Sequence, residues 1–200
     1  MYLPKIREVK EALSSLFSSP YTTKYPAVPY TAPKEYRGKP KYYSEECIGC
    51  GTCAQVCPAS AIEVVDDVKK MVRTLRVDYC SCINCGQCEE KCITSKGIKC
   101  TNDYVLSVTS TKAPEVYETC EKDLVICEIC GEIIACRDHL QWIKTRLGAK
   151  AYSNPNFLLE TQNLFYNSEH YSAKERIRRE DYIKEVCPRC RQKIVVIDEN

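Results

Sequence analysis

The first apolar pattern along the chain indicates a helix over residues 3–17. Its apolar positions recur at steps of three and four, and they are Leu3, Ile6, Val9, Leu13, Leu16 and Phe17. Such steps draw one apolar stripe along a helix. The other face carries Lys5, Arg7, Lys10 and Glu11. We expect this helix to dock on a partner subunit or a membrane surface, with packing on the protein's own core as the alternative.

The helical pattern is lost between Ser18 and Tyr43, where prolines and tyrosines dominate. The prolines, which interrupt any helix, are Pro20, Pro26, Pro29, Pro33 and Pro40. The tyrosines, which supply large amphipathic contacts, are Tyr21, Tyr25, Tyr30, Tyr36, Tyr42 and Tyr43. A flexible linker would be rich in Gly and Ser instead. The composition predicts an extended arm along the surface of another protein, with wrapping around its own domain as the alternative.

Strand-like patterns follow. The positions Ile62, Val64 and Val65 predict a short strand, Asp66 and Asp67 a turn, and Leu75, Val77 and Tyr79 a second strand of alternating pattern. Further strand-like stretches are Ile98 and Tyr104–Val108.

The last third of the chain contains one clear helix signal, over Asp138–Leu147, with Asp138 as its N-cap and Gly148 at its end. The stretch from Ala149 to Glu185 is polar, and Lys174–Glu180 is typical of a solvated, mixed-charge helix face.

Sixteen cysteines change this picture. Two runs, CIGCGTCAQVCP at Cys47–Pro58 and CINCGQCEEKC at Cys82–Cys92, share the spacing Cys-x2-Cys-x2-Cys-x3-Cys. This spacing holds [4Fe–4S] clusters: three cysteines curl around one cluster, and the fourth ligates the cluster of the other run. The predicted ligands are Cys47, Cys50, Cys53 and Cys92 for the first cluster, and Cys82, Cys85, Cys88 and Cys57 for the second.

The two runs are also a repeat, because every cysteine of the first run recurs 35 residues later, and Gly51 recurs as Gly86. Disulfides or zinc knuckles are the alternative, which the matching register of the two runs disfavours. The stretch resembles the two-cluster bacterial ferredoxin fold. It departs from that family at Ile93, where proline follows the fourth cysteine in the family pattern.

A second metal-type pattern lies near the C-terminus. The knuckles VICEICG at Val125–Gly131 and VCPRC at Val186–Cys190 predict a tetrahedral zinc site, with rubredoxin-like iron as the alternative. Its ligands would be Cys127, Cys130, Cys187 and Cys190. Of the other cysteines, Cys80, Cys100 and Cys120 are expected to be small buried apolar residues. Cys136 and His139 fall on the expected helix and are not predicted to be ligands.

The overall composition excludes several classes. A net charge of +2 without a basic stripe disfavours a nucleic-acid-binding zinc protein. The N-terminus has no apolar signal sequence, and the metal-type cysteine spacing indicates a reducing cytosol. No apolar run reaches the ~18 residues of a membrane span. We find no phosphate-binding glycine loop and no pairing of nucleophile and base.

The order of these features resembles the two-cluster iron–sulfur subunit of formate hydrogenlyase and related membrane-bound nickel–iron hydrogenases, which is similar in turn to the two-cubane subunit of respiratory complex I. The features are the N-terminal helix, the arm with Arg37-Gly38, the two ferredoxin motifs and the C-terminal cysteine knuckles. The knuckles favour the hydrogenase branch, because the complex I subunit generally lacks them.

The resemblance implies an electron-transfer subunit that is not catalytic alone, with the nickel–iron site elsewhere. Its implied partners are the small, large and membrane subunits of the hydrogenase and a donor such as ferredoxin or a formate dehydrogenase subunit. The implied location is the cytoplasmic face of the membrane. The alternatives are a complex I-like subunit, a freestanding soluble ferredoxin and a scaffold whose clusters only hold the fold.

The expected fold class is α+β. We expect a docking helix and arm over residues 1–40, a ferredoxin domain with two clusters over 41–112, and a zinc-ribbon or rubredoxin-like unit with a helical insertion over 113–200.

Overall fold

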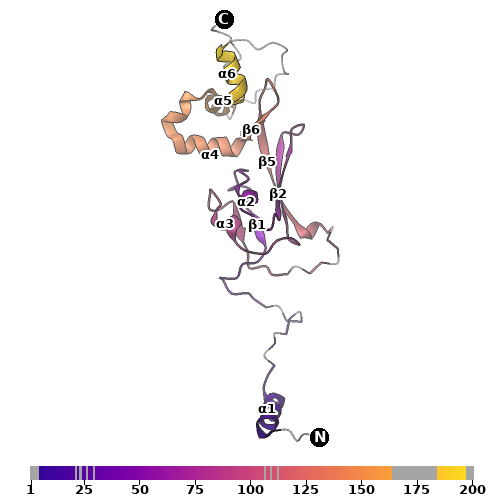
Figure 1. The fold of residues 1–200 in the computed structure, drawn as a ribbon. Helices are drawn as coiled ribbons and strands as arrows, with labels where there is room; N and C mark the ends of the chain where they lie inside the picture. The colour runs from indigo at the N-terminus through magenta and orange to yellow at the C-terminus, as the bar shows by residue number, and fades with distance from the viewer. Residues whose placement is uncertain are drawn as a thin grey trace. The chain divides into compact units, whose positions relative to one another are not determined.

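A computed structural model describes residues 5–163 and 184–196, apart from residues 21, 23, 26, 29, 106, 109 and 112. The chain divides into two compact units, Met1–Lys34 and Glu35–Asn200 (Figure 1). Some positions used in the predictions lie outside the described residues, namely Leu3, Tyr21, Pro26, Pro29 and Lys174–Glu180.

The first unit contains helix α1, Ile6–Phe17, as the apolar periodicity predicts. Its first turn is closed by the carboxylate of Glu8, which accepts the backbone N–H of Lys5 at 2.9 Å. No residue of α1 is buried, and its most exposed large apolar side chains are Ile6 at 90% and Phe17 at 85%. The described residues of this unit after α1 form neither helix nor strand.

The second unit contains two antiparallel sheets (Figure 1). The smaller sheet pairs β1, Pro40–Tyr42, with β4, Ile98–Cys100. The larger sheet has the order β2-β3-β5-β6, and its strands are β2, Ile62–Asp67; β3, Val72–Asp78; β5, Tyr117–Ile126; and β6, Ile133–Cys136. The predicted hairpin is therefore present as β2 and β3. Asp66 and Asp67, which were predicted to form the turn, both belong to β2. The Asp67 carboxylate accepts the N–H groups of Lys69 and Lys70 in the turn that follows.

Strand β5 connects the two cysteine-rich parts of this unit. It pairs with β3 on one side and with β6 on the other, so one sheet continues past the expected boundary at residue 112. Four of the ten residues of β5 are charged, and Cys120, Leu124 and Val125 are buried. Glu35–Asn200 is accordingly a single compact unit.

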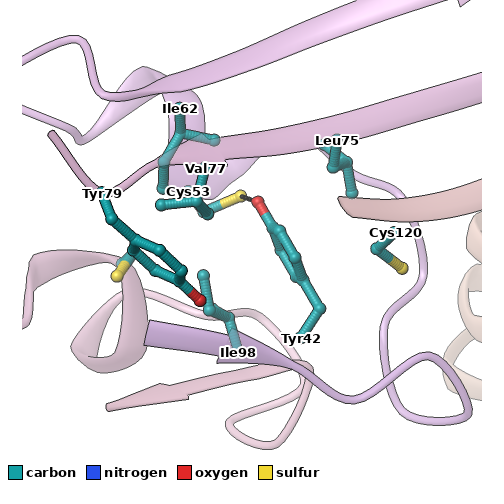
Figure 2. Packing of buried hydrophobic residues seen from close by; sticks show 9 residues of the cluster. Tyr42, Cys53, Ile62, Leu75, Val77, Tyr79, Ile98 and Cys120 are labelled. Carbon is teal, nitrogen blue, oxygen red and sulfur yellow. Dashed lines mark hydrogen bonds between the residues drawn. The ribbon is translucent and has the colours of Figure 1, made fainter. Parts of the chain in front are cut away.

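The main core lies between the sheets and the cysteine motifs (Figure 2). It is built from Leu75 and Val77 of β3, Ile98 of β4 and Cys120 of β5, all exposed by 3% or less. Tyr42 and Tyr79 place their rings in the same core.

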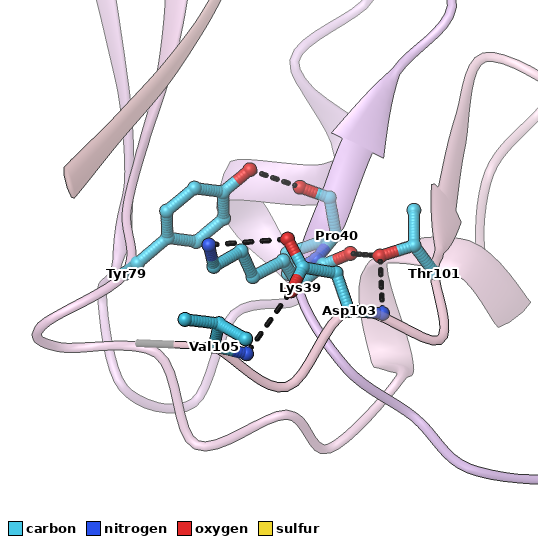
Figure 3. A network of polar contacts seen from close by, with 6 residues as sticks. All are labelled: Lys39, Pro40, Tyr79, Thr101, Asp103 and Val105. Atoms are coloured by element: carbon cyan, nitrogen blue, oxygen red, sulfur yellow. Dashed lines mark hydrogen bonds and ion pairs between the residues drawn. The ribbon is translucent and has the colours of Figure 1, made fainter. Parts of the chain in front are cut away.

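The residues before β1 are fastened to this unit by backbone pairing. The N–H of Gly38 donates to Thr101 O at 2.7 Å, and a Cβ on Gly38 would lie 2.1 Å from Asp103 O, so only glycine fits. Figure 3 shows Lys39 paired with Asp103 at 3.2 Å, with its ammonium 5.6 Å from the centre of the Tyr79 ring. The last residues of the predicted arm are thus part of the folded unit.

Helices and short turns complete the chain. The short elements are α2, Thr52–Gln55; α3, Gln87–Glu90; and the 3-10 turns η1, Pro114–Val116, and η2, Gly148–Ser153. The longer helices are α4, Arg137–Leu147; α5, Pro155–Asn163; and α6, Pro188–Val196.

Two predictions about local structure are wrong. The described residues of Tyr104–Val108 form no strand, because the Asp103 carboxylate takes the Val105 N–H at 3.0 Å, a local bond that competes with strand pairing. The N-cap of α4 is Cys136 and not Asp138, whose carboxylate instead binds the Lys122 ammonium at 2.7 Å. Gly148 ends α4 as predicted, with φ of 56°.

Candidate metal centres

The two ferredoxin-type motifs fold alike. In each, the glycine after the second cysteine adopts a left-handed conformation and begins a one-turn helix: Gly51 at φ 75° before α2, and Gly86 at φ 78° before α3. This conformation favours glycine because it has no Cβ. The sequence repeat is thus also a repeat of backbone shape.

Each motif loop surrounds part of a cavity that the other motif completes. One cavity has Cys47, Cys50, Cys53 and Cys92 in its lining. The other has Cys57, Cys82, Cys85 and Cys88. We call these the first and second cysteine sets. Crossed ligation, in which Cys57 and Cys92 each bind the cluster of the other motif, requires the cysteines to be grouped in this way. Binding of the clusters itself remains a prediction.

The donor chemistry of both sets fits a [4Fe–4S] cluster. Four thiols line each cavity, and apolar side chains such as Leu75 and Ile98 cover the first. Burial raises the pKa of the Cys53 thiol, so a metal must displace its proton to bind. Among the described residues, neither set has three ligand atoms close enough together for a single ion. Thiols spread around a cavity suit a cluster, in which each cysteine binds a different iron.

Three sulfurs of the first cysteine set have side-chain hydroxyl neighbours. The hydroxyl of buried Tyr42 lies 3.5 Å from Cys53 Sγ (Figure 2). The pairs Thr52 with Cys50, at 3.3 Å, and Thr94 with Cys92, at 3.4 Å, repeat this contact. Such hydrogen bonds are among the factors that set the electronics of a cluster.

The four-stranded sheet fixes the loop of the first motif. The Gly49 carbonyl accepts the Arg73 guanidinium at 2.9 Å and the Cys136 thiol at 3.4 Å. Two hydrogen bonds from Arg73 hold the pKa of Asp66 below its usual value, so this supporting ion pair remains charged. The Lys122 ammonium donates to the Ser44 carbonyl beside the same loop.

The C-terminal cysteines form a compact four-sulfur group. Cys127 and Cys130 lie in the β5–β6 turn, and Cys187 and Cys190 lie at the start of α6. All four sulfurs lie within 4.8 Å of one another, and the Cys130 and Cys187 sulfurs are 3.7 Å apart. A tetrahedral Zn²⁺ with Zn–S bonds near 2.3 Å would space its sulfurs by ~3.8 Å. The four cysteines thus fit a single tetrahedral ion.

The thiols of this group have unequal surroundings, because burial raises the pKa of Cys187 and of Cys190 while the pKa of Cys127 is lowered. Burial raises the pKa of the Cys127 thiol, but hydrogen bonds from backbone groups of Cys130, Cys187 and Ile129 outweigh it and lower that pKa to about 7. The thiolate is the form of cysteine that binds metal.

The remaining cysteines have three different environments. Cys120 is buried, as predicted, and Cys100 is half-buried in the lining of the second cavity. Cys80 is exposed, so the prediction that it is buried is wrong; it follows β3 in a turn where Asp78 accepts its N–H. Half-buried His139 does not belong to the four-sulfur group.

Sequence reasoning missed the residues that support the motifs. Thr52 and Thr94 each stand two positions after a ligand cysteine, a spacing that could have indicated them. Arg37 was noted only as part of a motif, and it donates to the Cys85 carbonyl at 2.9 Å. Tyr42, Lys122 and Cys136 carry no local signal, because their contacts are made across the fold.

Comparisons with known proteins agree with this geometry. Residues 46–96 match the family described as a 4Fe-4S dicluster domain. The chain is similar to NADH-quinone oxidoreductase subunit I 2 of Geobacter metallireducens, at 30% identity over 115 residues, which cover 54% of this chain and 87% of that protein. It is 35% identical to NAD(P)H-quinone oxidoreductase subunit I of Gloeobacter violaceus over 95 residues, 44% of each chain.

Two further similarities cover a shorter stretch of sequence or show a lower structural similarity. Formate hydrogenlyase subunit 6 of Escherichia coli K12 is 40% identical over 47 residues, 24% of this chain and 26% of that protein. An archaeal membrane-bound sulfane sulfur reductase has a chain that is 29% identical with a TM-score of 0.41, covering 55% of this chain and 59% of that one. The chain therefore spans under half of some relatives and most of another. Within the described residues, no helix has the length and apolar character needed to cross a membrane.

Proposed function

Because the chain belongs to the family of two-cluster iron–sulfur subunits that includes NADH-quinone oxidoreductase subunit I, we propose that it relays electrons within a larger oxidoreductase complex. The observation that carries this proposal is the grouping of eight cysteines around two cavities. We propose Cys47, Cys50, Cys53 and Cys92 as ligands of one [4Fe–4S] cluster, and Cys82, Cys85, Cys88 and Cys57 as ligands of the other.

The chain's own residues would hold the two redox centres close together and limit the access of water to them. When bound, each cluster supplies a site that gains and loses one electron. Cys53 and Cys88 belong to one buried core, and the short helices α2 and α3 that carry them lie against each other. Leu75 and Ile98 keep water from the first set. This arrangement favours passage of electrons between the two sites.

The C-terminal four-cysteine group serves a structural role in this proposal. We assign it a zinc ion, with iron as the alternative, bound by Cys127, Cys130, Cys187 and Cys190. Four thiolates close a tetrahedral shell and leave no position for a substrate. The ion would fasten the start of α6 to the β5–β6 turn.

We further propose a nickel–iron hydrogenase complex of the formate hydrogenlyase type as the assembly, with the chain peripheral at the cytoplasmic face of the membrane. The similarity to formate hydrogenlyase subunit 6 and the C-terminal cysteine group support this choice. The partners would be the hydrogenase small, large and membrane subunits and an electron donor.

A complex I-like quinone oxidoreductase is the second candidate, because the similarity to the Geobacter protein covers 87% of that protein.

Metal analysis and purification from the native host test this proposal. Anaerobically prepared protein should contain eight irons, eight sulfides and one zinc per chain, and both clusters should be reduced reversibly. It should copurify with a nickel-containing subunit. Four irons per chain would contradict the two-cluster assignment. Purification as a lone monomer would favour a freestanding ferredoxin. Copurification with a flavin- or quinone-linked complex that contains no nickel would favour the second candidate.

A further inference from the structure

The ligand sulfurs of the two cysteine sets have unequal hydrogen-bond surroundings. Three of the four sulfurs in the first set lie beside a side-chain hydroxyl. The pairs are Tyr42 with Cys53 at 3.5 Å, Thr52 with Cys50 at 3.3 Å, and Thr94 with Cys92 at 3.4 Å.

The direction of these bonds follows from the chemistry of a bound sulfur. A cysteine that ligates iron has lost its proton, so it can only accept, and each hydroxyl must donate. Thr94 is already oriented for this, since its oxygen accepts the Gly97 N–H at 3.0 Å and leaves its own proton for Cys92.

The second set has fewer such donors. Backbone N–H groups reach Cys57 at 3.3 Å, from Ala61, and Cys82 at 3.5 Å, from Asn84. The Asn84 carboxamide lies 3.4 Å from Cys82 Sγ with its oxygen nearer, and a flip of the amide could supply one N–H. No hydroxyl of the described residues lies within hydrogen-bonding distance of a sulfur in this set. Hydroxyl and carboxamide donors therefore number three against at most one. The thiols of Cys120 and Cys100 add one weak donor to each set, at Cys47 and Cys88, and so do not change the difference.

This difference has a direct electrochemical consequence. Reduction adds negative charge that is shared with the sulfurs, and donated hydrogen bonds stabilise that charge, which raises the reduction potential. We propose that the first cysteine set holds the cluster of higher potential, because the hydroxyls of Tyr42, Thr52 and Thr94 donate to its ligands. The inference rests on the proposed function, and it gives the relay a direction: electrons run downhill from the second set to the first.

Other factors do not reverse this order. Each set has one buried and three half-buried cysteines, so ligand exposure does not separate them. Arg37 places a positive charge beside the second set, but that bond is exposed and its charge is screened by water and salt. Near the first set, Arg73 and Lys122 are neutralised by carboxylates. The bond between Tyr42 and Cys53 is buried, where hydrogen bonds act more strongly.

A redox titration of the full-length, two-cluster protein followed by EPR tests the proposal. The wild type should show two reduction steps. Tyr42→Phe removes one donor and keeps the ring, and Thr94→Val removes another at nearly constant volume. Each should shift the higher potential downward and leave the lower one in place, and the double variant should bring the two steps closer together.

Tyr79→Phe is the control at a second buried tyrosine of the same core, because its hydroxyl donates to the Pro40 carbonyl at 2.9 Å and not to a sulfur of either set. It should shift neither potential. Thr52→Val gives a further test on a half-buried residue if Tyr42→Phe disturbs folding. A shift of the lower potential, or of neither, overturns the proposed order. A wild-type protein without two reduction steps contradicts the electron-relay function itself, a distinguishable result.

Discussion

Two glycines of the first motif carry different constraints at the residue scale. Both have positive φ, 68° for Gly49 and 75° for Gly51. A Cβ on Gly49 would also lie 2.6 Å from Cys136 Sγ, whereas one on Gly51 would meet its nearest neighbour at 3.8 Å. The close approach at Gly49 lets its carbonyl receive Arg73 and Cys136 together.

Gly49→Ala should therefore destabilise the protein more than Gly51→Ala. The left-handed conformation costs either alanine about 1–2 kcal/mol, and only Gly49→Ala adds a clash with a buried sulfur. Thermal unfolding of the cluster-loaded variants measures the difference. Equal losses would show that the loop can move away from β6 without penalty.

The fourth cysteine of the first motif tests the crossed ligand sets. Cys57 lines the cavity of the second set, so Cys57→Ser should alter the EPR signal of the cluster held by Cys82, Cys85 and Cys88 and spare the other. Cys80→Ser is the control, since Cys80 is an exposed cysteine outside both sets. A change confined to the first cluster would rule out the crossed arrangement.

At the scale of elements, β5 links the ferredoxin-type motifs to the C-terminal cysteine group. Its central residues pair with β3 behind the first set, and its end leads into the turn of Cys127 and Cys130. Lys122 extends from this strand to the Ser44 carbonyl. The C-terminal region thus supports the first motif as well as its own four-cysteine group.

Removal of one C-terminal ligand should loosen α6 and leave the clusters intact. Cys187→Ser leaves three thiolates, so the ion is held weakly and α6 loses its attachment to the β5–β6 turn. We expect a lower unfolding temperature and loss of zinc by elemental analysis, with normal cluster spectra. Cys80→Ser changes an exposed cysteine outside this group and should have no effect. A reversible redox signal from the wild-type site would instead identify iron and a third relay position.

At the scale of the whole molecule, α1 stands out because none of its residues is buried. Its apolar face, Ile6, Val9, Leu13, Leu16 and Phe17, is exposed in the structure. Soluble proteins rarely leave so continuous an apolar surface in water. Docking on another subunit of the proposed complex would cover it.

A truncation that begins at Glu35 should keep both clusters and lose assembly. The folded unit starts there, and the cut retains Arg37 and the Gly38 pairing. Visible spectra should match those of the full chain, while native gels should show the truncated protein outside the complex. A cut at Lys41 should also weaken cluster binding, because it removes the strand pairing of Pro40. Normal assembly of the Glu35 truncation would show that the N-terminal unit is not the anchor.

The sequence by itself determined the features whose geometry is local. The spacing of cysteines within each run sets the two loops and their one-turn helices, apolar periodicity sets α1, and alternation around Asp67 sets the β2–β3 hairpin. The four C-terminal cysteines could also be named, because two Cys-x2-Cys knuckles offer the four thiolates that one tetrahedral ion takes.

Only the tertiary structure decided which residues support the sites. The pairing of Leu75 with Cys120 brings β5 behind the first set. No local pattern marks β5, because charged residues interrupt its apolar positions and the strand is stabilised by neighbouring strands on both sides. The hydroxyl of Tyr42 reaches Cys53, and the thiol of Cys136 reaches Gly49, through the same long-range packing. The spacing of the predicted ligands can be read from nearby residues, whereas these hydrogen bonds join segments that meet only when the chain folds.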